Sequence, residues 1–231
     1  MIVLNLRNLR NLWITSSSRK GRMKIAIIGT GHVGAALGKG WAARGHMVTF
    51  GSRQPGNPKV GALLEDAGPN ASAAAVRDAV ARSSIVVLAV PYSAARERLE
   101  MAGDLAGKVL IDCTNPIAPG LRSAVGNGES GAEQIAAWAP KAKVVKAFNT
   151  TGAENMAAPA YNGQPTTMFL CGDDEMAKAA VWQLAEELGF EVVDAGDLSA
   201  ARHLENLALL WIHLAQVSGM GRGIAFRLVR R

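Results

Sequence analysis

The stretch that decides the fold reads Lys24-Ile-Ala-Ile-Ile-Gly-Thr-Gly-His-Val-Gly34. The residues after Lys24 form a short, uninterrupted apolar run, which is typical of a strand buried on both faces. Three glycines spaced G-x-G-x-x-G come next, and apolar residues then recur at helical spacing as far as Trp41. The glycine spacing alone is common, but a position after a strand and before a helix is the context that dinucleotide-binding loops require.

Each glycine of this loop has a physical task. Gly29 permits a tight turn, Gly31 lets the backbone approach a pyrophosphate, and Gly34 lets the helix pack against the strand. The helix that begins here presents N–H groups and a partial positive charge to phosphates. A glycine-rich turn in an unrelated protein is the alternative, whereas a P-loop is excluded because Val33 and Gly40 stand where it needs Gly and Ser or Thr. The expected dinucleotide contacts are these three glycines, and His32 lies in the same loop.

Strand-like and helix-like stretches alternate along the rest of the chain. Further strands are expected at 47–50, 71–73, 85–90, 108–112, 143–148, 166–170 and 190–194. Helices are expected at 59–67, 74–82, 93–101, 132–138, 174–188 and 199–217. The alternation predicts an α/β fold with a Rossmann-type, doubly wound, mostly parallel sheet. We expect residues 23–148 to form the dinucleotide-binding domain and residues 149–231 a small C-terminal α/β extension for acceptor binding and dimerisation.

The end of the second predicted strand indicates which dinucleotide binds. An NAD site usually carries Asp or Glu there to hold the ribose hydroxyls, but this chain has Ser52-Arg53 and no carboxylate before Glu65. A hydroxyl and a guanidinium suit a 2′-phosphate, with Lys59 as support, so NADP is predicted. The alternative is that Arg53 is a solvated surface residue. Val90-Pro91 ends the fourth strand beside the expected nicotinamide site, although Pro91 could simply terminate the strand.

Composition excludes several classes of function. The chain has 231 residues, of which 49% are hydrophobic and 19% charged, so it is not disordered. Aromatic residues make up 5%, too few for a base-stacking surface, and no nucleic-acid partner is expected. The net charge of +6 is local: residues 1–64 hold ten Lys and Arg and no acid, whereas the remainder holds 15 basic and 19 acidic residues.

Residues 1–22 differ from the rest, being rich in Arg, Asn and Ser. Such a composition suits an organellar transit peptide, or else upstream sequence read from an early start codon. We expect this leader to lie outside the fold. No apolar run is long enough to cross a membrane, so no membrane partner is expected. Cys113 and Cys171 lie far apart without a Cys/His cluster, which predicts no metal site and a reduced, cytoplasmic protein.

At this point the sequence resembles a known family, the NADPH-dependent reductases of the deazaflavin coenzyme F420. The resemblance covers about residues 23–228 and is carried, besides the glycine loop and Gly51-Ser-Arg53, by AVPY (89–92), KAFNT (146–150), CGDD (171–174), DAGDLSAARHLE (194–205) and SGMG (218–221). It implies a two-electron exchange between NADP and the deazaflavin. It also places Asn149-Thr150 and Met220-Gly221 near the second ring system. The residues that it places on the dinucleotide are Gly29, Thr30, Gly31, Val33, Gly34, Ser52 and Arg53. The KAFN stretch is similar, too, to the cytosolic oxidoreductase domain of membrane ferric reductases, which pass electrons to a flavin.

The resulting expectation is an oxidoreductase that transfers a hydride between NADP(H) and a stacked deazaflavin or flavin-like acceptor. Positioning two rings face to face supplies most of such catalysis, so no side chain, including the four histidines, is given a catalytic role. The alternatives are a dehydrogenase or imine reductase of the β-hydroxyacid dehydrogenase type, and a non-catalytic NADPH sensor.

The last predicted helix carries more apolar surface than one packed face needs. Leu204, Leu207, Trp211, Leu214 and Ala215 form a stripe, and Leu209, Leu210 and Ile212 widen it nearly all round. We expect a homodimer that buries this helix; the alternative is a core helix within one subunit.

Overall fold

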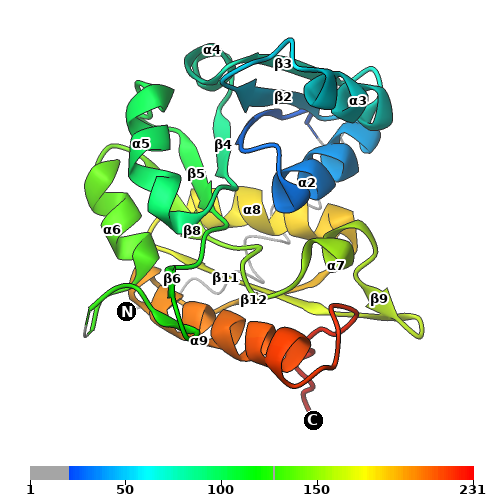
Figure 1. The fold of residues 1–231 in the computed structure, drawn as a ribbon, viewed down its shortest axis with the longest axis vertical. Helices are drawn as coiled ribbons and strands as arrows, with labels where there is room; N and C mark the ends of the chain where they lie inside the picture. Colours follow the sequence, from blue (N-terminus) through cyan, green and yellow to red (C-terminus); the bar gives the residue numbers. More distant parts are fainter. Residues whose placement is uncertain (1–20, 127) are drawn as a thin grey trace.

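The fold is that of a computed structural model, which describes residues 21–126 and 128–231. A parallel array makes up most of the main sheet. Its strands are β1 (Lys24–Ile28), β2 (Met47–Ser52), β3 (Ala71–Ala75), β4 (Ile85–Leu88), β5 (Val109–Asp112) and β8 (Lys143–Lys146). They lie in the order β3-β2-β1-β4-β5-β8, which is the doubly wound order (Figure 1). The predicted Rossmann-type fold is therefore confirmed, with the strand order reversing between β1 and β4.

Helices cover both faces of the sheet (Figure 1). Alternate side chains of β1 supply the two cores: Ile25 and Ile27 enter one, Ala26 and Ile28 the other. The first core also takes α2 (His32–Ala43), α3 (Pro58–Ala67), α7 (Ala153–Ala157) and α8 (Glu175–Leu188). The second takes α4 (Val76–Ala81), α5 (Tyr92–Ala102), α6 (Gly131–Trp138) and α9 (Ala201–Ile212). Consequently α2 and α9 pack on opposite faces of the sheet.

The C-terminal part extends the same sheet in the reverse direction. β11 (Thr167–Gly172) pairs antiparallel with β8, and β12 (Glu191–Asp194) pairs parallel with β11. The boundary expected after residue 148 thus falls between two strands of one continuous sheet. Helix α7 and two hairpins had no signal in the sequence because they are so short. One hairpin consists of β6 (Ile117–Ala118) and β7 (Arg122–Ser123), and the other of β9 (Ala160–Tyr161) and β10 (Gln164–Pro165).

Most predicted elements end within two residues of the expected positions, and three differences bear on the site. β4 stops at Leu88, two residues early, where the glycine loop comes against the carbonyl of Ala89. β8 stops at Lys146 rather than 148, and Phe148 leaves the strand conformation with a φ of 58°. The helix expected over 199–217 is three pieces: a 3-10 turn at Leu198–Ala200, then α9, then a π-helical turn at His213–Val217.

Within one subunit, α9 uses only part of its apolar surface. Leu204, Ala208, Trp211 and Ala215 are buried, Leu207 and Leu214 are half-buried, and Leu210 is 47% exposed. Figure 1 shows α9 along the lower edge of the molecule. The helix therefore packs on its own subunit with one side and leaves the other open.

The expected leader falls mostly on residues 1–20, which lie outside the described residues. Gly21 and Arg22 are exposed, and Arg22 donates a hydrogen bond of 2.6 Å to Asn70 Oδ1. Among the helices of the described part, none combines the length and the apolar character that crossing a membrane demands. Cys113 and Cys171 are free and buried, and burial raises the pKa of the Cys171 thiol to about 12.

Candidate active site

The glycine loop between β1 and α2 is tightly packed at its first and third glycines and open at its second. Gly29 has a φ of 112°, and a Cβ there would lie 2.2 Å from the Ala89 carbonyl oxygen. A Cβ on Gly34 would lie 2.0 Å from the carbonyl oxygen of Gly29. A Cβ on Gly31 would meet nothing within 4 Å. The fold itself therefore requires Gly29 and Gly34, whereas the absence of a side chain at Gly31 matters only to something that approaches from outside.

The N-terminus of α2 is shaped to receive an anion. Gly31 is its N-cap, no side chain caps it, and its first turn contains no acidic residue. The backbone N–H groups of that turn lack partners within the helix. Thr30 and His32 are exposed and Val33 is half-buried, so the predicted loop residues border open space. Together with the helix dipole, this arrangement suits a phosphate group.

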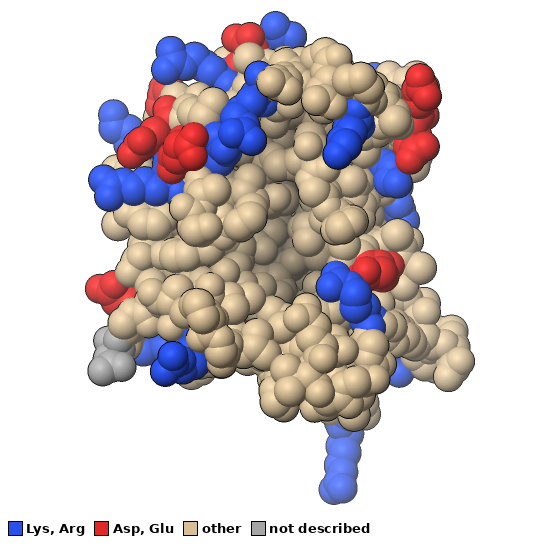
Figure 2. Space-filling view, viewed as in Figure 1, with Lys and Arg blue, Asp and Glu red and all other residues tan. Residues whose placement is uncertain are grey.

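The residues predicted to hold the 2′-phosphate lie on the turn from the end of β2 to the start of α3. The Asn57 N–H donates to the Gln54 carbonyl at 3.0 Å, which turns the chain back on itself. Arg53 and Lys59 are both exposed, and the first turn of α3 contains no acid. Lys and Arg side chains lie on both sides of the upper end of the hollow in Figure 2. This end of the site is thus open and basic.

The carboxyl end of β4 closes against the glycine loop. A Cβ on Gly29 would lie 3.0 Å from Val90 Cγ1, so the structure brings these two predicted residues together. Pro91 is exposed and is the N-cap of α5. Tyr92 Oη donates to Gln134 Oε1 at 2.5 Å. Burial raises the pKa of this phenol, and the negative charge of Glu205 raises it further.

Next to β4, two asparagines lock the turns that follow β5 and β8. Asn149 Nδ2 donates to Asn115 Oδ1 at 3.0 Å, and Asn115 Nδ2 donates to the Asn149 carbonyl at 2.9 Å. Asn149 Oδ1 is buried and has no hydrogen-bond partner among the described residues. Phe148, with its positive φ, precedes it in a conformation that is strained for a bulky residue. Sequence reasoning missed Asn115; its signal was an Asn-Pro pair directly after a buried strand, at the carboxyl edge of the sheet.

Met220-Gly221 lies at the end of the last helix. The N–H groups of Met220 and Gly221 donate to the carbonyls of Leu214 and Ala215, both at 3.1 Å, and the Met220 side chain is 60% exposed. The segment that follows is tied to α7, because Arg222 Nε donates to Glu154 Oε1 at 2.7 Å. The structure thus brings the C-terminal segment to α7, which begins three residues after Thr150.

The electrostatics of Glu154 connect this corner to the glycine loop. The hydrogen bond from Arg222 lowers the pKa of the Glu154 carboxyl, and the positive charges of Arg222 and His32 add to that effect. Arg222 also lies over the Trp211 ring, 5.7 Å from its centroid. The glycine loop, α7 and the C-terminal segment therefore border one hollow, which Figure 2 shows crossing the middle of this face.

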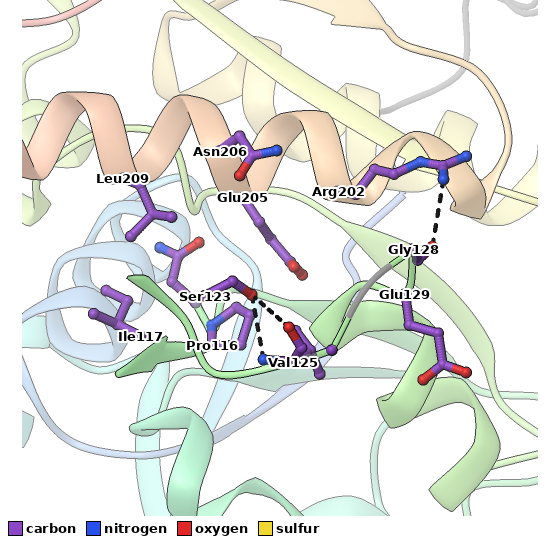
Figure 3. A pocket seen from close by; sticks show the side chains of 12 residues that line it. Pro116, Ile117, Ser123, Val125, Gly128, Glu129, Arg202, Glu205, Asn206 and Leu209 are labelled. Atoms are coloured by element: carbon purple, nitrogen blue, oxygen red, sulfur yellow. Dashed lines mark hydrogen bonds between the residues drawn. The ribbon is translucent and has the colours of Figure 1, made fainter. Parts of the chain in front are cut away.

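A cavity of about 230 Å³ lies beside the asparagine pair, between α9 and the loop after β5. Figure 3 shows Glu205 and Leu209 pointing from α9 toward the loop that carries Pro116 and Ile117. The sequence analysis missed the lining residues of this cavity too, although those from α9 recur every three or four residues and so share one face of the helix. The helical wall of the cavity consists of Arg202, Glu205, Asn206 and Leu209. Over the described residues, no cluster of His, Cys, Asp and Glu is arranged to hold a metal ion.

Comparison with known proteins agrees with this geometry. The family model described as "NADP oxidoreductase coenzyme F420-dependent" matches residues 24–116. A crystal structure from Arthrobacter sp. fb24, provisionally named an F420-dependent NADP-reductase, is 35% identical. That likeness covers 90% of this chain and 100% of the other, with a TM-score of 0.82.

Two further similarities point to related proteins of other kinds. Metalloreductase STEAP3 of Rattus norvegicus is 32% identical over 189 residues, which is 80% of this chain. The chain spans 36% of the length of that curated relative. A reductive aminase from Aspergillus terreus, solved with NADPH4, shares the fold at 22% identity with a TM-score of 0.64, over 86% of this chain and 64% of the other.

Proposed function

The chain belongs to the family of coenzyme F420-dependent NADP oxidoreductases, and from this premise we propose that it transfers a hydride between NADP(H) and a flat ring acceptor of the deazaflavin type. The observation that carries the proposal is the pairing of an uncapped helix N-terminus, free of acidic residues, with a strand end that bears Ser52-Arg53. The first suits a pyrophosphate and the second an added phosphate on the ribose.

The residues present fit the dinucleotide. The open space at Gly31 lets phosphate oxygens reach the first N–H groups of α2, because no Cβ stands between them. Arg53, with Lys59 nearby, would hold the 2′-phosphate by charge-assisted hydrogen bonds, which contribute roughly 1.5–3 kcal/mol each. Val90 and the turn at Asn149 would flank the nicotinamide, since they lie at the carboxyl ends of β4 and β8 where the sheet order places the ligand crevice.

The proposed hydride transfer requires little of the side chains except that they position the two rings. Bound NADPH supplies a hydride, and a ring acceptor takes it as an electron pair. The asparagine pair fixes the distance between the turns after β5 and β8, and the strained Phe148 is held in place by complete burial. The exposed site residues and the hollow shown in Figure 2 leave room for a second flat molecule beside the dinucleotide.

The acceptor is proposed from the relatives. The Arthrobacter protein's name favours coenzyme F420, and we take it as the first choice. A flavin is the second candidate, because the KAFN stretch (146–149) resembles ferric reductases that pass electrons to a flavin, and a metalloreductase is among the relatives. A small carbonyl or imine ranks below both, because the similarity to the reductive aminase is confined to the fold.

A single screen tests the proposal. Purified protein is mixed with NADPH and, in separate wells, with F420, FMN, FAD, a ferric chelate, and cyclohexanone plus an amine, while NADPH oxidation is followed by absorbance. We expect turnover with F420, or with a flavin, and none in wells without a ring acceptor. Turnover only with the carbonyl and amine would replace this proposal by the imine-reducing alternative, and tight NADPH binding without any turnover would favour a sensor.

We also propose that the protein is a homodimer through the open side of α9. Leu210 is 47% exposed at the middle of that helix, with Leu207 and Leu214 half-buried nearby in sequence. A contiguous apolar strip of this kind is suited to a second copy of the same helix. Sedimentation equilibrium at micromolar concentration should give twice the chain mass, and a monomer mass there would reject the dimer.

A further inference from the structure

A fully buried lysine lies directly behind the two asparagine turns. Lys146 Nζ donates to Asp112 Oδ2 at 2.8 Å and to the Thr114 carbonyl at 2.5 Å, and lies 3.0 Å from Glu205 Oε1. The side chains of Lys146 and Asp112 have no exposed surface, and that of Glu205 is 7% exposed. These contacts occupy all three ammonium protons, so Lys146 is fully satisfied inside the fold.

The carboxylates of this cluster reach further partners. Glu205 Oε2 accepts the Gly131 N–H at 2.9 Å, and Glu205 Oε1 accepts the Ala132 N–H at 3.1 Å. These are first-turn amides of α6, which lack partners inside their own helix. Asp112 Oδ1 accepts the Thr114 N–H at 2.8 Å. Glu205 therefore connects α9 to the start of α6 and, through Lys146, to the ends of β8 and β5.

Stability alone does not account for two carboxylates around one ammonium in the core. Burial by itself lowers the pKa of Lys146, but the charges of Asp112 and Glu205 outweigh it and raise that pKa. Buried ion pairs often contribute no more to stability than well-packed apolar residues would. What this cluster adds is geometry, because it joins four segments of the chain that meet beside the Asn115–Asn149 pair.

We propose that Glu205 is a positioning residue that sets the acceptor side of the active site without taking part in dinucleotide binding; this rests on the proposed hydride transfer to a ring acceptor. On α9, Glu205 is flanked by Arg202, Asn206 and Leu209, which form the helical wall of the cavity (Figure 3). Loss of the Glu205 contacts frees α9 to shift, and that wall moves with it.

The part of the site that would hold the phosphates of the dinucleotide is separate from this cluster. The glycine loop belongs to β1 and α2, and α2 packs on the opposite face of the sheet from α9. Ser52 and Arg53 lie at the end of β2, and three strands (β1, β4 and β5) separate β2 from β8 in the sheet. A disturbance of Glu205 should therefore leave the affinity for NADPH intact while it changes the use of the acceptor.

The test measures both substrates on the same variants. Glu205→Gln keeps the shape of the side chain but removes its charge. It also replaces one accepting oxygen by an NH2 group, which is a donor and faces the donors of Lys146 and of the first turn of α6. Glu205→Asp keeps the charge and shortens the reach, and serves as the milder variant where Glu205→Gln fails to fold. Glu100→Gln, at an exposed position on α5, is the control for loss of a carboxylate. The acceptor is F420, or FMN where the wild type uses only FMN.

We expect Glu205→Gln to raise the acceptor KM at least fivefold or lower kcat at least tenfold, with the Kd for NADPH within twofold of wild type. Glu205→Asp should shift the same parameters in the same direction by about twofold to threefold, and Glu100→Gln should change none of them. Equal changes in NADPH affinity and acceptor kinetics, or a lower melting temperature with both unchanged, would overturn the positioning role. Failure of the proposed function shows earlier and differently, as wild-type protein that turns over no ring acceptor.

Discussion

The two halves of the sheet are built on different principles. From β1 to β5 all strands are parallel, and the predicted dinucleotide contacts lie in the turns where strands end or in the first turn of the helix that follows. From β8 onward the sheet reverses at β11, and contacts between residues far apart in sequence hold the segments together. Lys146 meets Glu205, and Trp211 Nε1 donates to the Ile224 carbonyl, a residue that also accepts from Asn155.

On the proposed function, this difference would separate dinucleotide binding from selection of the acceptor. In the first half, backbone geometry would define the dinucleotide site, because glycines and one arginine make up most of the predicted contacts. In the second half, side-chain contacts would define the acceptor side, which would then depend on how α9 and the C-terminal segment are held. Substitutions in the two halves should consequently change different properties: stability or NADPH affinity in the first half, and use of the acceptor or attachment of the C-terminal segment in the second.

The largest effect should come from Gly34→Ala. The added Cβ would lie 2.0 Å from the Gly29 carbonyl oxygen and 3.1 Å from Ile27 Cγ2, inside the best-packed part of the first half. Overpacking of this kind against backbone should lower the free energy of unfolding by about 3 kcal/mol or more. Denaturant unfolding measures it, and a midpoint equal to wild type would show that the loop has room for a methyl group at this position.

Gly31→Ala is the matched substitution and should act on binding alone. Its Cβ meets nothing within 4 Å in the free protein, so the unfolding midpoint should be unchanged. A methyl group there stands in the path of phosphate oxygens approaching the amides of α2, and loss of hydrogen bonds to a charged group of roughly 1.5–3 kcal/mol corresponds to about a tenfold to hundredfold loss of affinity. Titration of NADPH measures it, and undiminished affinity would place the pyrophosphate elsewhere.

The fold was predictable where local pattern governs it. The run Ile25–Ile28, the three glycines and Ser52-Arg53 all lie within one β-α-β stretch, so their roles followed from spacing. Asn115 and Glu205 were not predictable in the same way, because their partners lie 34 and 59 residues away or more in the chain. The break of the last helix into α9 and a π-helical turn likewise depends on the C-terminal segment that packs against it.

Arg53→Ala should discriminate between the two nicotinamide dinucleotides. The guanidinium is exposed at the end of β2 and meets no acid in the following helix turn, so it is available to a 2′-phosphate. NADPH affinity should fall about tenfold, and NADH affinity should stay within about twofold, because NADH lacks that phosphate. Calorimetric titration with NADPH and with NADH measures the two affinities, and an equal loss for both would show that Arg53 does not hold the 2′-phosphate.

In the second half, the Glu154–Arg222 pair should give a small pH dependence. The folded-state pKa of Glu154 is lowered, so the stabilising contribution of the pair is complete above the unfolded pKa near 4.5 and disappears as pH falls through the folded value. Because both side chains are about half-exposed, we expect at most about 0.5 kcal/mol. Glu154→Gln should be less stable than wild type at pH 7, and the difference in the free energy of unfolding should shrink as the pH falls below 4.5. A difference that is the same at every pH would show that packing, and not charge, holds the C-terminal segment to α7.

The smallest effect should follow from removing residues 1–22. The first core residue of the described chain is Ile25, and the backbone of Met23 already pairs with the start of β2, because its carbonyl accepts the Met47 N–H at 2.9 Å. The Met23 N–H donates to His46 Nδ1 at 3.1 Å, and a new amino terminus at Met23 can still donate there. Within the described part of the chain, the truncation removes the hydrogen bond from exposed Arg22 to Asn70, so the free energy of unfolding should change by less than about 0.5 kcal/mol.

Thermal unfolding and NADPH titration of a chain that starts at Met23 measure the effect of this truncation. A decrease of several kcal/mol, or a weaker affinity for the cofactor, would show that residues 1–22 pack on the first half or take part in its site.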